Sequence, residues 1–121
     1  MIGKITTELG SISYADELIA KVAGMAAGEN YGIASMNAKK ASDTILQLVG
    51  GESQTRGVRV SSQDGGESVD IDLYVTLVYG VTLPTVAQNT ISNVRYRVTE
   101  MTGVKVNNVN IHVEGIRVPE E

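Results

Sequence analysis

The sequence contains no cysteine, no tryptophan and no phenylalanine in 121 residues. Without cysteine, disulfide bonds, thiolate catalysis and cysteine-based metal sites are all excluded. The five aromatic residues are all tyrosines. A hydrophobic core must therefore be built from valine, isoleucine, leucine, methionine and alanine, which suits a β-sheet covered by slender helices.

Long apolar runs and clustered positive charge are lacking as well. No apolar run approaches the roughly 18–20 residues that cross a bilayer, and residues 1–5 do not have the form of a secretory signal. The net charge is −4, and the ten lysine and arginine residues are dispersed. Proteins that bind nucleic acid or anionic membranes carry concentrated positive charge. We therefore expect a cytoplasmic protein that neither inserts into a membrane nor binds nucleic acid.

Two segments have the three- and four-residue spacing of apolar side chains that predicts amphipathic helices. The first runs from Ser13, a favourable N-cap, to Ala27, and Gly28 is expected to end it. The second follows Pro84, a residue type common in the first helical turn, and is expected to end at Gly103. The predicted buried stripes comprise Leu18, Ile19, Val22, Ala23 and Ala26 in the first helix, and Ala87, Ile91, Val94, Val98 and Met101 in the second.

Three segments alternate apolar and polar residues, which predicts half-buried β-strands. They are residues 58–61, 69–77 and 109–113. The first two are joined by Asp64-Gly65-Gly66, a hairpin turn signal, and Gly115 indicates a bulge near the end of the third. Residues 4–9 and 31–36 favour two further short strands. Residues 42–49 fit either a brief helix or a loop.

These elements predict a single domain, residues 1–121, of the α+β class, with a small three- to four-stranded sheet and two helices packed on one face. Residues 119–121 are expected to be a short, frayed C-terminal tail. The other face of the sheet would meet solvent or a partner. Its predicted side chains are those of Asp70, Asp72, Tyr74, Asn108, Asn110 and His112.

The polar residues do not form a recognisable catalytic or metal-binding set. His112 is the only histidine, so we interpret it as an exposed strand residue in preference to a general base or a metal ligand. Asp70 and Asp72 would suit a divalent cation or acid–base chemistry, but alternate aspartates also keep a strand face hydrated. The run Arg95-Tyr96-Arg97 would suit a phosphate or a carboxylate, and solvated helix charge is the simpler explanation. We predict no enzymatic activity, no cofactor and no metal.

Two blocks of the sequence resemble the alkaline-shock protein family of Gram-positive bacteria, also called the YloU-like envelope-stress family. The first is Gly10-Ser11-Ile12-Ser13 together with residues 18–26. The second lies between residues 57 and 116 and contains Val78-Tyr79-Gly80, Thr102-Gly103-Val104 and Val109-Asn110-Ile111-His112-Val113. The order of these pieces is specific, and the two blocks cover most of the chain. Residues 37–56 look like a variable insert that is particular to this protein.

The resemblance implies an α+β domain without known catalytic residues. It also implies an abundant cytoplasmic protein that self-associates and gathers at the membrane by binding a membrane-anchored relative, with a role in cell-envelope homeostasis and stress tolerance. We therefore predict a non-enzymatic, self-associating scaffold protein. The alternative is an RNA-binding module, because helices on one side of a small sheet have a KH-like topology. The sequence lacks the Gly-x-x-Gly clamp with basic neighbours that such modules use.

Four residues are candidates for contacts with a partner protein. Tyr74 and Val78 lie on the predicted outer face of the sheet, and Ile45 and Val49 are apolar residues of the insert. Tyrosine and aliphatic side chains on an otherwise polar surface often mark binding patches. We predict that these residues contribute to protein–protein contacts.

Overall fold

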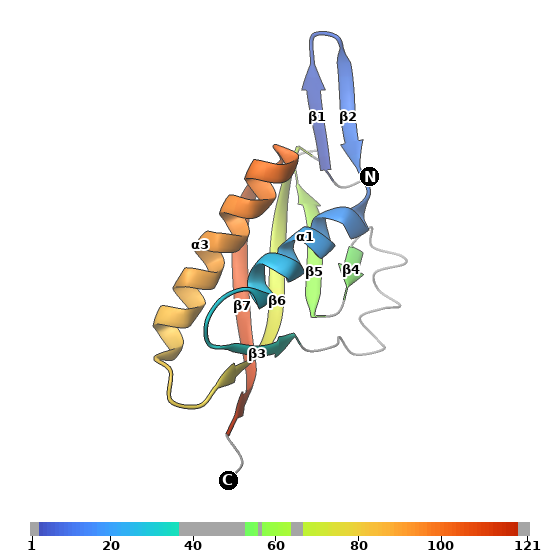
Figure 1. Cartoon of the computed structure of the whole chain (residues 1–121). Coiled ribbons are helices and arrows are strands. Elements are labelled where there is room, and N and C mark those ends of the chain that lie inside the picture. The colour runs from blue at the N-terminus through green and yellow to red at the C-terminus, as the bar shows by residue number, and fades with distance from the viewer. Residues whose placement is uncertain (1–2, 37–52, 56, 64–66, 119–121) are drawn as a thin grey trace.

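The computed structural model describes residues 3–36, 53–55, 57–63 and 67–118. Two helices and seven strands lie in these ranges (Figure 1). In chain order they are β1 (Gly3–Thr7), β2 (Gly10–Tyr14), α1 (Asp16–Gly28), β3 (Ile33–Met36), β4 (Ser53–Thr55), β5 (Val58–Gln63), β6 (Ser68–Val78), α3 (Leu83–Thr102) and β7 (Lys105–Arg117).

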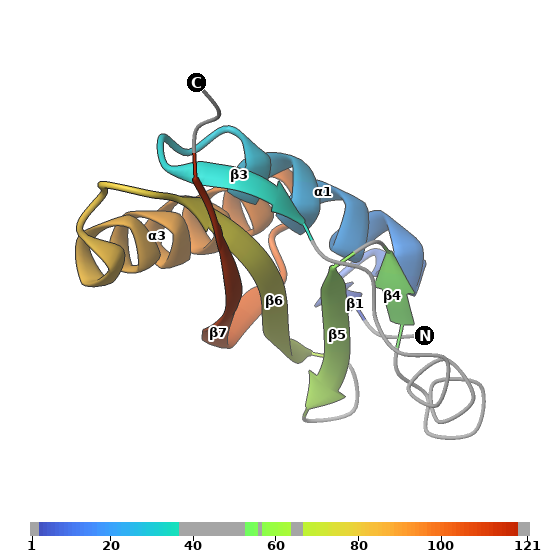
Figure 2. The same cartoon turned by 90° about the horizontal axis from the view of Figure 1, so that it is seen from below.

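Strand β6 is the centre of a five-stranded sheet. β7 runs parallel to β6 along one edge, whereas β5 and β3 pair antiparallel with the first and last parts of the other edge. β4 adds to β5, and β1 and β2 form a separate two-stranded sheet. Both helices cover one face of the five-stranded sheet (Figure 2). The predicted α+β class with two helices on one face is confirmed. Within the described residues the sheet has five strands in place of the expected three to four, and β4 was not predicted.

The alternation along β6 places every second side chain in the core. Val69, Ile71 and Leu73, followed by Val75 and Leu77, are all fully buried, as predicted. The pairing of β5 with β6 confirms the hairpin between them. The predicted turn residues 64–66 and the segment 42–49 lie outside the described residues, as does the tail 119–121.

The start of the first helix was predicted wrongly. Ser13 is not the N-cap, because it lies in β2 opposite Lys4, and the helix begins at Asp16 after Ala15. Leu18, predicted to be buried, is 43% exposed, because it lies in the first turn at the edge of the buried stripe. The other four residues of that predicted stripe are buried.

The end of the first helix is held by a side chain. Gly28 was expected to lie just after the helix, but it is the last helical residue and Glu29 is the C-cap. Asn30 donates from Nδ2 to the carbonyl oxygens of Ala26 and Ala27, at 2.9 and 3.3 Å. The Asn30 amide thus adds a side-chain partner for two carbonyls of the last turn, and Ala27 O also accepts from the backbone N–H of Asn30 at 3.2 Å.

The second helix begins and ends as predicted, but its buried face is rotated. Pro84 lies in the first turn, and Gly103 ends the helix in the left-handed conformation with φ +76°. Met101, predicted to be buried, is 62% exposed, and Ala87 and Ile91 are only partly buried. The buried residues are Val86, Thr90, Val94, Val98 and Thr102. Each threonine hydroxyl donates to the carbonyl four residues earlier, so burial leaves it hydrogen-bonded.

The last strand alternates as predicted, yet its end is poorly covered. Val109 is buried and Ile111 is partly buried, but Val113 is 41% exposed although it pairs with the buried Val75. The register with β6 shifts so that Val75 pairs with Val113 and Thr76 with Gly115. The predicted bulge beside Gly115 is therefore confirmed.

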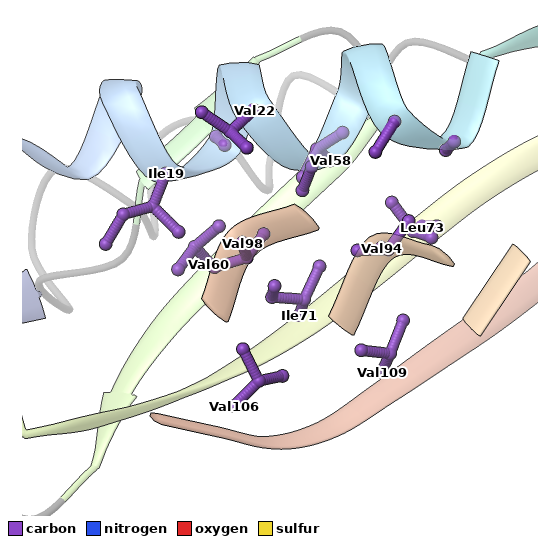
Figure 3. Packing of buried hydrophobic residues seen from close by; sticks show 14 of the residues in the cluster. Ile19, Val22, Val58, Val60, Ile71, Leu73, Val94, Val98, Val106 and Val109 are labelled. Carbon is purple, nitrogen blue, oxygen red and sulfur yellow. The ribbon is translucent and has the colours of Figure 1, made fainter. Parts of the chain in front are cut away.

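The core between the helices and the sheet is aliphatic. Figure 3 shows Ile19 and Val22 of α1 facing Val58 and Val60 of β5, and α3 residues facing β6 and β7. Fully burying a side chain of this size contributes about 1.5–3 kcal/mol relative to leaving it exposed. This packing places α1 and α3 on one side, and no described helix or strand covers the opposite face of the sheet, called the open face below.

Candidate interaction surfaces

The open face of the sheet carries two matched pairs of aspartate and asparagine. The register of β6 and β7 places Asn108 opposite Asp70 and Asn110 opposite Asp72. Asn108 Nδ2 donates to Asp70 Oδ1 at 3.3 Å, and Asn110 Nδ2 donates to Asp72 Oδ1 at 3.1 Å. Both aspartates predicted for this face lie there. Their oxygens accept hydrogen bonds across the strands, which supports a structural role over cation binding.

Tyr74 and His112 form the next pair on the same face. Their ring centroids are 4.5 Å apart and the ring planes differ by 12°, so the rings are stacked. His112 Nε2 also lies 3.2 Å from Asp72 Oδ1. The stack and this contact fix the orientation of both rings on the open face. Tyr74, which was predicted to contact a partner, is half-buried, and its ring is stacked on His112.

The other predicted contact residues are placed only in part. Val78 lies on the open face four positions beyond Tyr74, and its backbone N–H donates to Gly32 O at 2.8 Å. Ile45 and Val49 lie outside the described residues. Tyr31 and Tyr79 are 87% and 64% exposed, and neither was predicted from the sequence to be a contact residue. No periodic pattern surrounds them that would have marked them.

A projecting hairpin forms a second surface, which was not predicted from the sequence. Figure 1 shows β1 and β2 standing away from the helices and the main sheet. Leu9 at the tip is fully exposed, and Ile12 is 48% exposed. Ile5 and Tyr14 pack against the core cluster and hold the base of the hairpin. The sequence signal was weak, because the two residues of the turn, at positions 8 and 9, are glutamate and leucine, which are not typical turn residues.

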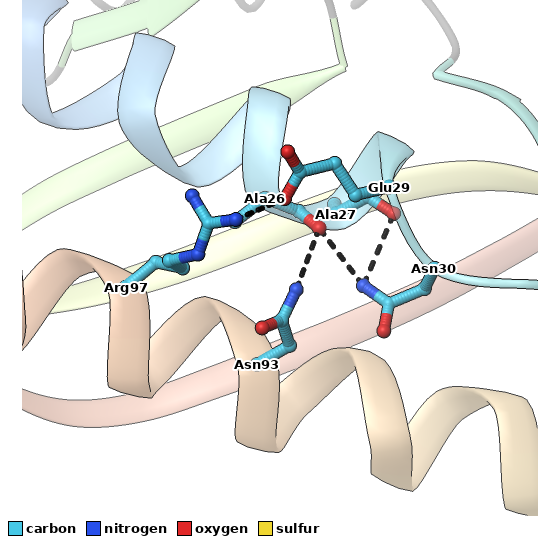
Figure 4. A network of polar contacts seen from close by, with 6 residues as sticks. All are labelled: Ala26, Ala27, Glu29, Asn30, Asn93 and Arg97. Carbon is cyan, nitrogen blue, oxygen red and sulfur yellow. Dashed lines mark hydrogen bonds and ion pairs between the residues drawn. The ribbon is translucent and has the colours of Figure 1, made fainter.

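The arginines of the run Arg95-Tyr96-Arg97 are engaged within the fold. Arg97 Nη2 lies 2.7 Å from Glu29 Oε1, and Asn93 Nδ2 donates to Ala26 O at 2.9 Å (Figure 4). Arg95 donates to the carbonyl oxygens of Val106 and Asn107 at 2.7 and 3.0 Å. These contacts join α3 to α1 and to β7. These contacts indicate a structural role for both arginines.

The described residues offer little for catalysis or metal binding. They contain no cluster of three or more histidine, aspartate or glutamate side chains placed to hold a metal ion. A pocket of about 280 Å³ lies between the end of α1 and the start of α3, and its lining, which includes Asn30, Tyr31, Thr85 and Asn89, has no charged side chain. Neither described helix combines the length and the apolar character needed to span a membrane.

Comparison with known proteins connects this fold with a bacterial family. The model of the alkaline-shock protein 23 family, described by its cell envelope-related function, matches residues 4–118. No solved structure matches the chain.

Individual relatives are similar over nearly the whole chain. YloU of Bacillus subtilis is 38% identical over 116 residues, which is 95% of each chain. YqhY of the same organism is 35% identical over 92% of this chain and 80% of its own length. A protein of Streptococcus pyogenes named as a homologue of the stress response regulator gls24 is 30% identical over 93% of this chain and 62% of its own length.

Proposed function

The chain belongs to the alkaline-shock protein 23 family, the family that its sequence resembles, and from this premise we propose that it is a non-enzymatic, self-associating scaffold protein of the cell-envelope stress response. Protein–protein contact is the proposed activity. The observation that carries the proposal is the open sheet face, where Tyr74 and His112 are stacked and oriented beside the polar pairs.

A preformed polar and aromatic surface is suited to recognition. Ordering a side chain on binding costs free energy, and a side chain already held by a neighbour avoids most of that cost. Tyr74 is held by the stack, and Asp72 is held by Asn110 and His112. Tyrosine is also a residue type enriched at protein interfaces.

The proposed location is the cytoplasm, with recruitment to the membrane by a membrane-anchored relative. The net charge of −4 favours recruitment through a protein over direct binding to anionic lipid. A family function related to the cell envelope supports the same arrangement.

Light scattering coupled to gel filtration tests self-association. We expect the average mass of the wild-type protein to rise with concentration. Tyr74→Asp adds a charge to the open face and should weaken assembly without changing the circular dichroism spectrum. Tyr31→Asp, the same substitution at a tyrosine outside the sheet, is the matched control. A wild-type protein that stays monomeric at the highest concentration and captures no partner contradicts the proposal.

A further inference from the structure

One edge of the main sheet has no neighbouring strand in the described part of the chain. β7 spans 13 residues, and among the described strands it pairs only with β6. Arg95 covers the start of the free edge by donating to the carbonyl oxygens of Val106 and Asn107. From Asn108 onward the described residues place no second strand beside β7. A long open strand edge is a template for pairing with another chain, and proteins usually blunt it.

Apolar side chains accompany this open edge on the helix side of the sheet. Val113 and Ile116 pair with Val75 and Leu77, which are buried, yet Val113 is 41% and Ile116 47% exposed. Figures 1 and 2 show the reason, because α3 moves away from β7 toward the N-terminal end of the helix. A strand added beside β7 would therefore bury apolar surface as well as form backbone hydrogen bonds.

The same chain carries a strand that is able to fill this position. β2 pairs only with β1 in the described residues, and the hairpin projects from the body (Figure 1). Thr7 and Gly10 are the last paired residues before the turn. Because hydrogen-bonded and non-hydrogen-bonded pairs alternate along an antiparallel ladder, the backbone N–H groups of Ser11 and Ser13 point away from β1. A two-stranded hairpin alone is marginally stable in water, and a third strand stabilises it.

We infer that the hairpin of one copy docks on the β7 edge of a second copy, with β2 extending the five-stranded sheet. This inference rests on the proposed self-association and adds the hairpin and the β7 edge to the open face as contact surfaces. The side-chain patterns agree. Ile12 lies between Ser11 and Ser13, just as Ile111 lies between Asn110 and His112. Apolar side chains of both strands then share the helix side, and polar side chains share the open face.

The contact joins two different surfaces, so each copy retains an unused hairpin or an unused edge after pairing. Such a heterologous contact adds further copies unless the rotation between neighbours closes a ring. A short strand pairing is small beside the roughly 1,600 Å² of a standard interface. Assembly should therefore depend steeply on protein concentration and disperse on dilution.

Two variants separate the two surfaces. Ile12→Lys places a charge on the hairpin, and Val113→Lys places one beside the β7 edge, where an inward lysine opposes strand addition. Each variant alone should lose self-association at concentrations where the wild type assembles. An equimolar mixture retains one intact hairpin and one intact edge, so it should give a species of twice the monomer mass and no larger one. Leu18→Lys, at an exposed apolar residue of α1, is the matched control and should assemble normally.

The alternative outcomes are distinct. If Ile12→Lys still dimerises while Val113→Lys does not, the edge pairs with itself and the inference is wrong; the reverse result means that hairpins pair with each other and also overturns it. A mixture that stays monomeric, or variants that both assemble like the wild type, overturns it while self-association stands. A monomeric wild type removes the proposed function itself. Circular dichroism monitors folding, and Ser11→Pro and Ile116→Lys replace any variant that unfolds.

Discussion

Tyr74 stacks on His112 across two parallel strands, with the ring centroids 4.5 Å apart. The only histidine of the chain is therefore a packing partner of a tyrosine and a neighbour of Asp72. Tyr74 is half-buried like the other β6 side chains of this face, and one face of its ring is covered by the imidazole. The contribution of this stack to the free energy of unfolding can be measured by mutation of the two residues.

The stacked pair should couple energetically. Tyr74→Ala and His112→Ala should each lower the free energy of unfolding, and a double-mutant cycle should give a coupling of about 0.5–1.5 kcal/mol, as expected of paired rings. Urea denaturation followed by circular dichroism measures all four proteins. Effects that add to within about 0.3 kcal/mol would show that the stack contributes nothing.

The centre of β6 should be sensitive to loss of volume. Leu73 is fully buried, so Leu73→Ala should lower the free energy of unfolding by about 2–5 kcal/mol through lost transfer energy and a residual cavity. Leu18→Ala is the control, because Leu18 is 43% exposed and should change stability much less. Thermal and urea unfolding of both variants gives the comparison. Equal losses would contradict the assigned core.

Gly103 should resist substitution more than Gly28. At Gly103, φ is +76° and an added Cβ would lie 2.8 Å from Ile5 Cδ1, so Gly103→Ala should destabilise the protein by about 1–2 kcal/mol. Gly28 is the last residue of α1, and no described residue has an atom within 4 Å of an added Cβ, so Gly28→Ala should be neutral or stabilising. Thermal melts of the two variants measure the difference. Because Ile5 supports the hairpin, Gly103→Ala should also increase proteolysis of β1 and β2.

RNA binding, the alternative function, should be undetectable. The net charge is −4, and the two arginines nearest each other in the sequence contact Glu29 and backbone carbonyl oxygens. Filter binding with single-stranded RNA at low salt checks this directly. Tight retention that weakens steeply as salt is added would contradict the scaffold proposal, since that salt dependence reports phosphate contacts.

The parts of the fold that follow a local rule were predictable from the sequence. Strict alternation located β6, and Pro84 and Gly103 located the ends of α3. The buried face of α3 was not predictable from apolar residues alone, because Thr90 and Thr102 satisfy their hydroxyl groups within the helix and can be buried. At these two positions, a hydrogen bond within the helix allows a polar side chain to be buried.

Local sequence patterns could not fully predict the hairpin and the open face, because both surfaces depend on pairing between separate strands. Ser13 is a good N-cap residue, but its pairing with Lys4 in the hairpin outweighs that preference. The open face was predicted by alternation, whereas the stack of Tyr74 on His112 required the register between β6 and β7. Residues 38 to 40 positions apart meet there. No single-segment pattern specifies such a register.

The contiguity of β6, α3 and β7 has a consequence for the order of folding. The central strand, its helix and its parallel neighbour form one uninterrupted stretch of chain, from Ser68 to Arg117. Closing this loop costs less entropy than bringing β3 from the distant N-terminal part onto the other edge. The C-terminal half is thus suited to nucleate first, and its central amides should be the slowest to exchange with deuterium.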